Sequence, residues 1–151
     1  MPEAMEADRY ASLRLENQLC FPLYAASREI IRLYRPHLDA LDLTYTQYIT
    51  MMVLWEEQEI SVKQLGGRLY LDSGTLTPLL KSLETKGYVT RSRKEADERV
   101  VLVRLTDSGQ ALQEKALCVP PEMRTCVRLS DEEIAALYKL LYKLLAEGNG
   151  V

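Results

Sequence analysis

The stretch from Ser61 to Leu105 constrains the fold of this 151-residue chain more than any other. Its middle, from Ser73 to Lys86, predicts a helix with one apolar face, because its leucines recur at i, i+3, i+4 and i+7. These are Leu76, Leu79, Leu80 and Leu83. Asp72 or Ser73 is suited to capping the start of this helix, and Gly87 to ending it. The remaining positions favour contact with a polar partner, because they carry short hydroxyls and one cation. These are Thr75, Thr77, Lys81 and Ser82.

The flanks of this helix complete a recognisable motif. Residues Ser61 to Gln64 have the spacing of a capping box and open a short helix, in which two glycines at 66 and 67 allow another element to approach closely. Downstream, Tyr88 to Arg93 and Val100 to Leu105 predict two strands joined by a charged tip at 94–99. Helix, turn, helix and hairpin in this order are typical of a winged helix-turn-helix. We therefore expect a mainly α fold with a small β-hairpin.

Charge is distributed unevenly along the chain. Residues 61–104 contain nine Lys/Arg and five Asp/Glu, a net charge of +4, whereas the remainder carries −7. An acidic protein whose basic residues gather on one module is expected to contact nucleic acid through that module. Double-stranded DNA is therefore the expected partner. The alternative is a solvated hairpin on an unrelated α+β domain.

Composition and cysteine usage exclude several classes of protein. With 47% hydrophobic and 27% charged residues, the chain suits one compact domain over residues 1–151. No apolar run approaches the roughly 20 residues of a membrane span, and the acidic N-terminus is not a secretory signal. The three cysteines form no CxxC, and the only histidine is His37, so we expect no metal and no cofactor. A cytoplasmic protein with reduced thiols is expected.

Prolines divide the first third of the chain. A helical rhythm from Leu13 to Leu33 is interrupted at Pro22, where the helix either kinks or starts again. Pro36 is expected to end this segment near Tyr34. A second capping box, at residues 44–47, opens a helix with several large side chains inward. These are Tyr48, Met51, Met52, Leu54 and Trp55.

The C-terminal third predicts two more helices with a break between them. Thr106 caps a helix that ends at about Leu117, and two prolines break the chain between Cys118 and Leu129. A further capping box at 130–133 opens a helix with an apolar stripe through Ile134, Leu137, Leu141 and Leu144. The winged module, at about 45–105, needs only about three helices for its own core. The terminal helices, at about 13–41 and 130–147, are therefore expected to form a symmetric homodimer interface. The alternative is that they cover the core of a single chain.

Four strings together resemble one family of bacterial repressors. They are LENQLCF at 15–21, LTYTQY at 43–48, LYLDSGTLTP at 69–78, and the wing pair of Asp97 and Arg99. They are similar to the MarR family, in particular its organic-hydroperoxide sensor branch, from about Leu13 to Leu145. The wing pair is common to the whole family, and LENQLCF is the string specific to the branch. Pro22 departs from the branch, where an ordinary helix former is expected.

The resemblance implies a redox-sensing thiol. Cys20 would be oxidised to a sulfenic acid by an organic hydroperoxide, after which the repressor releases its operator. Tyr34 and Tyr45 would hydrogen-bond the thiolate from the two subunits, and Tyr24, one helical turn from Cys20, would line the pocket. The apolar neighbours of this cysteine favour an alkyl hydroperoxide over hydrogen peroxide. These are Leu19, Phe21 and Leu23.

Two-cysteine members of this branch pair the oxidised thiol with a second cysteine that follows the wing. Cys126 is the preferred resolving thiol, because its surroundings predict little regular structure and freedom to move. Cys118 is the other candidate, although it shares a helical face with Ala111 and is expected to be packed. A thiol from outside the protein is the third possibility.

The polar face and the wing predict how DNA is read. Ser73, Thr75 and Thr77 are expected in the major groove, with Lys81 on the same face. Asp72 is expected beside a base edge or orienting a neighbour, and Pro78 is expected to bend the first turn. At the wing, Arg99 is expected in the minor groove with Asp97 steadying it.

Three other functions remain open at this stage. One is a repressor released by a non-covalently bound phenolic or drug-like ligand, with Cys20 a bystander. Another is a thiol peroxidase, which is disfavoured because no Arg or His lies close to Cys20 in sequence and because an enzyme has no use for a wing. A purely architectural DNA-binding protein is the third. We expect no enzymatic activity.

Overall fold

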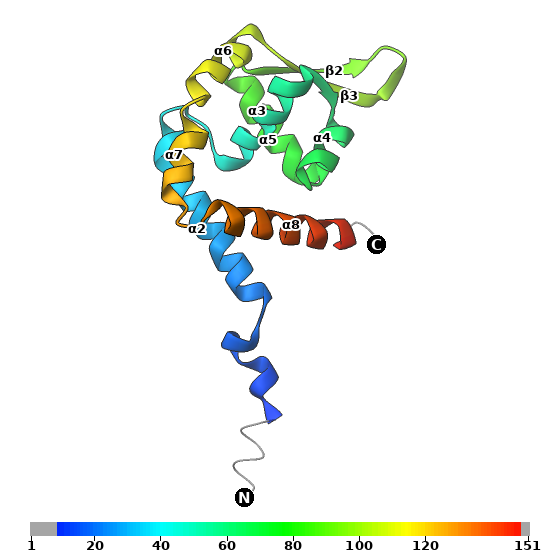
Figure 1. The fold of residues 1–151 in the computed structure, drawn as a ribbon. Helices are drawn as coiled ribbons and strands as arrows, with labels where there is room; N and C mark the ends of the chain where they lie inside the picture. The colour runs from blue at the N-terminus through cyan, green and yellow to red at the C-terminus, as the bar shows by residue number, and fades with distance from the viewer. Residues whose placement is uncertain (1–8, 149–151) are drawn as a thin grey trace, which may run out of the picture. The chain divides into compact units, whose positions relative to one another are not determined.

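The computed structural model describes residues 9–148 (Figure 1). They fall into two units, which divide after Val119 and are described separately. The first unit contains two short 3-10 turns, five α-helices and three strands. In chain order these are η1 (Ala11–Leu13), η2 (Leu15–Asn17), α2 (Cys20–Asp39), α3 (Tyr45–Glu57), β1 (Glu59–Ser61), α4 (Val62–Leu69), α5 (Ser73–Thr85), β2 (Val89–Lys94), β3 (Asp97–Leu105) and α6 (Asp107–Ala116). Helix α7 (Val119–Cys126) begins at the division, and α8 (Asp131–Gly148) follows.

The core of the first unit lies between α3, α4, α5 and the sheet. All four leucines of the predicted α5 stripe are buried, which confirms the expected apolar face. They lie in a core that also contains Met51 and Leu54 of α3, Leu65 of α4 and Val103 of β3. Burying a side chain of this size stabilises a fold by about 1.5–3 kcal/mol, so this cluster is sufficient to hold the three helices and the sheet together.

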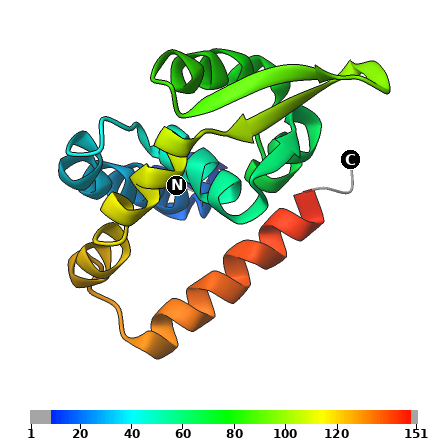
Figure 2. The same ribbon diagram turned by 90° about the horizontal axis from the view of Figure 1, so that it is seen from above.

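The sheet has three antiparallel strands in the order β1-β3-β2. The hairpin is confirmed, but its tip is shorter than predicted: β3 already begins at Asp97, and Lys94 pairs with Asp97 after a bulge. Figure 2 shows this β2–β3 hairpin extending away from the helices. The third strand, β1, was not predicted from the sequence. Three residues are too few to show a period-2 pattern, and Ile60 becomes a strand residue only by pairing with Val103.

The predicted capping boxes are confirmed where the structure describes them. Thr44 N–H donates to Gln47 Oε1 (3.1 Å), and the Gln47 N–H donates back to Thr44 Oγ1 (3.3 Å). The same reciprocal pair opens α4 at Ser61 and α8 at Ser130. Each box satisfies backbone N–H groups that the first helical turn leaves without an acceptor.

The prediction for α2 is partly wrong at both ends. The helix begins at Cys20, and the chain before it forms two 3-10 turns, so a helix from Leu13 is not observed. Pro22 lies in the first turn of α2, where backbone N–H groups have no acceptor within the helix. The N–H that proline lacks therefore costs no helical hydrogen bond. Pro36 does not end the helix, which continues to Asp39. Pro36 is exposed, so water can donate to the helix carbonyl that receives no N–H from this proline. The buried Leu38 anchors the last turn of the helix.

Two further expectations are corrected. Residues 119–126 form helix α7 rather than a break, because Pro120 and Pro121 both lie in its first turn. On α3, Met52 is 40% exposed and not inward, whereas Tyr48, Met51 and Leu54 are buried as predicted. Trp55 is half-buried, and its indole N–H donates to the carbonyl of Gly109 (2.9 Å).

Helix α8 has no buried residue, although its sequence is strongly apolar. Large side chains are exposed along its length, including Leu137, Tyr138, Leu140, Tyr142 and Leu144. Within the second unit this helix therefore has an apolar surface without a covering element. Among residues 9–148 no helix is long and apolar enough to cross a membrane.

Two glycines give a matched test of this packing. A Cβ on Gly109 would lie 2.3 Å from the carbonyl oxygen of Tyr88 and 2.7 Å from a methyl of Leu105, whereas a Cβ on Gly67 of α4 meets nothing within 4 Å. We expect Gly109→Ala to lower the free energy of unfolding by about 1–3 kcal/mol through overpacking. Gly67→Ala should raise it by up to about 1 kcal/mol through helix propensity.

Urea unfolding at one fixed protein concentration measures both changes. Equal stability of Gly109→Ala and the wild type would show that α6 can move away from Tyr88 and Leu105 without cost.

Candidate nucleic-acid interface and thiol site

The outer face of α5 presents the predicted hydroxyls and cation. Ser73, Thr75, Thr77 and Lys81 are all exposed. The carboxylate of Asp72 accepts from the Thr75 N–H (2.7 Å), and this backbone hydrogen bond holds the pKa of Asp72 below its usual value. Of the two roles expected for Asp72, the structure therefore supports orienting its neighbours. A face of this kind can donate to and accept from base edges and phosphates.

Ser82 does not belong to this outer face. It is half-buried, and its Oγ accepts from the side-chain amide of Gln47 on α3 (3.0 Å). The prediction placed Ser82 outward because helical periodicity shows only that it lies off the leucine stripe. A buried polar partner on another helix is not visible in that pattern.

The wing carries an exposed arginine at its tip. The Arg99 guanidinium donates to Asp97 Oδ1 (3.1 Å), as does the Arg99 backbone N–H (3.1 Å). These bonds lower the pKa of Asp97, while the Arg99 side chain stays 91% exposed. Across the hairpin, the Arg93 guanidinium donates to the Glu98 carbonyl (2.7 Å). Exposed ion pairs add little stability, so the effect of this pair is to orient the arginine.

A second ion pair joins α5 to the wing. The guanidinium of Arg91 on β2 lies 2.9 Å from Glu84 Oε2, and the Arg91 backbone N–H donates to Glu84 Oε1 (3.2 Å). These bonds lower the pKa of Glu84, which favours its carboxylate form. The pair holds the root of the hairpin against α5. Sequence reasoning missed it, because the two residues lie on different elements separated by a turn.

Cys20 is exposed at the first residue of α2. The backbone N–H groups of a first helical turn have no intrahelical acceptor and favour a negative charge beside them. A groove of about 620 Å³ is lined by Phe21 together with Arg14, Leu15 and Glu16. Leu15 and Phe21 give this groove an apolar part, and Phe21 directly follows Cys20 in the sequence.

The predicted tyrosines form a cluster on α2 and α3. The rings of Tyr34 and Tyr45 are 5.0 Å apart, and Tyr48 lies 5.9 Å from Tyr34. Burial raises the pKa of Tyr34 and of Tyr45, and it raises the pKa of Tyr48 to about 12. All three phenols are therefore protonated near neutral pH and can donate hydrogen bonds. Tyr48 was not predicted for this cluster. Its place three residues after Tyr45, on the same side of a predicted helix, could have indicated that the two rings lie together.

The thiol and this cluster are far apart within one chain. Cys20 and Tyr34 are fourteen residues apart on the same helix, which corresponds to about 21 Å along its axis. Tyr45 packs on Tyr34 and is therefore distant as well. Of the three tyrosines predicted for the thiol site, Tyr24 is the one that lies a single helical turn from Cys20 on α2. It is exposed, and its hydroxyl accepts from Arg28 (3.1 Å).

The other two cysteines are also free thiols. Cys118 is exposed, so the expectation that it is packed is wrong, and its Sγ donates to the Lys115 carbonyl (3.4 Å). Cys126 is half-buried at the last residue of α7, so the expectation that it lies in an irregular segment is wrong. Between residues 9 and 148, no group of three or more His, Cys, Asp and Glu side chains is placed to hold a metal ion.

Comparison with known proteins connects this geometry to regulators. A family profile described as transcriptional regulator SarA/Rot matches residues 32–116. The organic hydroperoxide resistance transcriptional regulator of Bacillus subtilis is 48% identical over 138 residues, which cover 91% of this chain and 94% of that protein.

Solved structures agree with this relationship. AbfR, a protein of Staphylococcus epidermidis whose reduced form has been solved bound to DNA, shares 37% identity and a TM-score of 0.74, covering 91% of this chain and 97% of that one. A mutant of MarR from E. coli, complexed with operator DNA, shares 30% identity and a TM-score of 0.77, covering 84% and 93%. This chain therefore belongs to the MarR family of transcriptional regulators, within the branch of the organic hydroperoxide resistance regulators.

Proposed function

We propose that this protein is a cytoplasmic repressor that releases its DNA operator when an organic hydroperoxide oxidises Cys20. The observation that carries the proposal is an exposed cysteine at the start of α2 in a chain that also presents a winged helix-turn-helix. The next residue, Phe21, lines a groove with an apolar part. Regulators with 48% identity that are named for organic hydroperoxide resistance support the nature of the signal.

DNA binding is assigned to α5 and the wing. Ser73, Thr75 and Thr77 enter the major groove, with Lys81 near a phosphate, and Arg99 enters the minor groove. The DNA-bound structures of similar regulators support double-stranded DNA as the partner. The Glu84–Arg91 pair holds the wing at the angle at which both contacts can be made together.

The chain acts as a homodimer. Its terminal helices expose large apolar side chains, including Phe21 and Ile31 of α2 and those of α8. A two-fold axis would place the two α5 helices about 34 Å apart, as successive major-groove half-sites require. A second copy also completes the thiol site. Because Tyr34 lies about 21 Å from Cys20 along α2, the tyrosines that donate to this thiolate come from the partner chain.

The chemistry needs only the thiolate and the oxidant. The Cys20 thiolate attacks the terminal oxygen of the hydroperoxide, the O–O bond breaks, and the alkoxide leaves and takes a proton to become an alcohol. Cys20 is then a sulfenic acid. Attack by a second thiol, for which Cys126 is the preferred and Cys118 the other candidate, forms a disulfide and releases water. Protonated phenols near the thiolate stabilise it before the reaction.

One observation supports a second candidate, release by a non-covalently bound phenolic ligand. A groove of about 400 Å³ beside α2 and the start of α3 is lined by Arg28, Arg32, Arg35, Thr44 and Tyr45, among others. Its guanidinium groups suit an anionic aromatic molecule. Release of DNA by such a ligand from a Cys20→Ser protein would favour this candidate over thiol oxidation.

Arg99→Ala tests the wing. We expect it to weaken operator binding by about 5- to 150-fold, because one oriented cation is lost from the groove. Arg104→Ala is the matched control, because it removes the same charge from the same strand. Like Arg99, Arg104 pairs with one acid, which is Glu59. Fluorescence anisotropy at one moderate salt concentration measures both. Equal losses in the two variants would reduce the role of Arg99 to general charge.

Cys20→Ser tests the sensor. The variant should bind operator with wild-type affinity and keep it after treatment with cumene hydroperoxide, because a hydroxyl is not oxidised under these conditions. Cys118→Ser is the control and should respond like the wild type. Gel shifts before and after treatment give the answer, and a Cys20→Ser protein that still leaves DNA moves the sensor to another cysteine.

The resolving thiol is tested on non-reducing gels. After hydroperoxide treatment the wild type and Cys118→Ser should run as covalent dimers, and Cys126→Ser should not. A disulfide needs Cα atoms within about 7 Å, so Cys126, at the end of α7, must approach the partner's Cys20 by rearrangement. The reverse pattern assigns the role to Cys118, and a wild type without a covalent dimer is resolved by an external thiol.

A further inference from the structure

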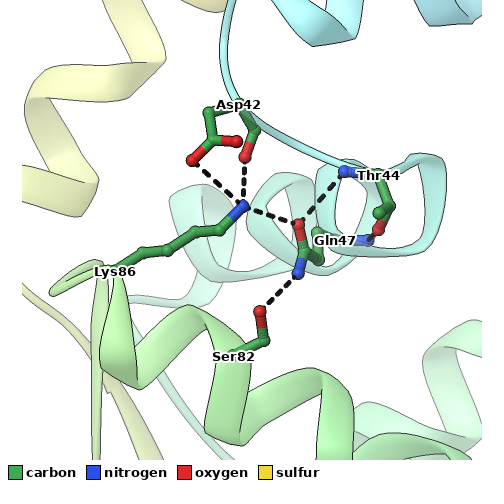
Figure 3. A network of polar contacts seen from close by, with 5 residues as sticks. All are labelled: Asp42, Thr44, Gln47, Ser82 and Lys86. Atoms are coloured by element: carbon green, nitrogen blue, oxygen red, sulfur yellow. Dashed lines mark hydrogen bonds and ion pairs between the residues drawn. The ribbon is translucent and has the colours of Figure 1, made fainter.

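A buried amide links the start of α3 to the end of α5 (Figure 3). We call it the Gln47 joint, formed by Asp42, Thr44, Gln47, Ser82 and Lys86. Gln47 is only 6% exposed, although glutamine is usually a surface residue. Asp42 and Thr44 belong to the α2–α3 connection, whereas Ser82 and Lys86 belong to α5 and its C-terminal cap. The joint therefore connects the start of α3 and the loop before it to the end of α5.

The hydrogen bonds of Gln47 leave it little freedom. Its Nε2 donates to Ser82 Oγ (3.0 Å), and its Oε1 accepts from the Thr44 backbone (3.1 Å) and from Lys86 Nζ (3.3 Å). Lys86 Nζ also donates to the carbonyl of Asp42 and lies 3.4 Å from its carboxylate. Loss of Ser82 Oγ leaves the buried Gln47 amide without this acceptor, and an unsatisfied buried group costs more than the bond itself contributes. No side-chain N or O atom is left in that state among the described residues.

The same turn of α3 carries part of the tyrosine cluster. Tyr45 lies two residues before Gln47 and packs on Tyr34, and Tyr48 lies one residue after it and packs on the same ring. The loop leading into this turn is constrained as well, because Asp42 has a left-handed backbone with φ of 52°. The first turn of α3 thus packs on Tyr34 of α2 through Tyr45 and Tyr48, and it bonds to α5 through Gln47.

We propose that the Gln47 joint transmits the oxidation state of the thiol site to the recognition helix α5. The inference rests on the proposed function, in which Tyr34 and Tyr45 contact the partner's thiolate. Oxidation replaces the contacts of Tyr45, and the first turn of α3 shifts with it. Because Gln47 is buried and bonded to both Ser82 and Lys86, these two residues follow it, which moves α5 relative to its operator. Gln47, Ser82 and Lys86 are positioning residues that touch neither DNA nor oxidant in this scheme.

The test uses variants on the α5 side, which leave the capping box of α3 intact. Ser82→Ala removes the acceptor of the Gln47 amide, and Lys86→Met removes the cation while keeping most of the side-chain stem. Thr85→Ala is the matched control: it removes another hydroxyl from α5, one that donates only to the Lys81 carbonyl of its own helix. The probe is a DNA duplex selected by the wild-type protein from a random-sequence pool. Dissociation constants are measured for reduced protein and after cumene hydroperoxide.

The readout is the ratio of the oxidised to the reduced dissociation constant, which a purely structural role would leave unchanged. We expect Ser82→Ala and Lys86→Met to lower this ratio by about 3- to 30-fold, the range seen for changes along a coupling network, and Thr85→Ala to keep it. A wild-type ratio in both Ser82→Ala and Lys86→Met overturns the inference alone. A wild-type protein that keeps its duplex after oxidation overturns the proposed function, and the inference with it.

Discussion

The leucine face of α5 is the contact on which the rest of the winged module depends. Leu76, Leu80 and Leu83 are almost fully buried, and they lie in the core shared with α3, α4 and the sheet. An amphipathic helix of thirteen residues is marginal alone in water and gains its stability from this burial. Once that face is buried, the opposite face must be exposed. The polar residues of α5 therefore reach solvent, where the proposed DNA contacts would be made.

Polar contacts then fix the orientation of α5 within this core. Asp72 caps its start, Glu84 ties it to β2 through Arg91, and Ser82 ties it to α3 through Gln47. Apolar packing is not directional and tolerates small rotations, whereas hydrogen bonds at 3 Å do not. A helix that must read base edges benefits from such contacts. In the proposed signalling scheme, a change in these contacts would change the orientation of the helix.

The length of α2 imposes a different constraint. It places Cys20 at one end and Tyr34 near the other, and no change of side-chain conformation can bridge a distance of about 21 Å. The thiol and its donors can therefore meet only if a second chain supplies one of them. The exposed apolar residues of α2 and α8 offer the surface on which such a partner would pack. In the proposed function, dimerisation and redox sensing would both follow from this geometry of α2.

The sequence by itself determined the features that depend on neighbours three or four residues apart. The α5 stripe, the caps at Thr44, Ser61 and Ser130 and the hairpin were all predictable, because helical periodicity and capping are local interactions. The family resemblance added the roles that we propose for Cys20 and the wing pair. Prolines misled the prediction at positions 36, 120 and 121, since their effect depends on which helical turn holds them and on exposure.

Only the tertiary structure decided what distant residues do together. Strand β1 exists because it pairs with β3 about forty residues later. Gln47 and Ser82, thirty-five residues apart, form a buried bond that turned a predicted outer-face hydroxyl into part of a joint. The separation of Cys20 from Tyr34 required knowing that α2 runs unbroken through both. In each case the deciding term is a contact or a distance between segments, and a single sequence does not record which segments meet.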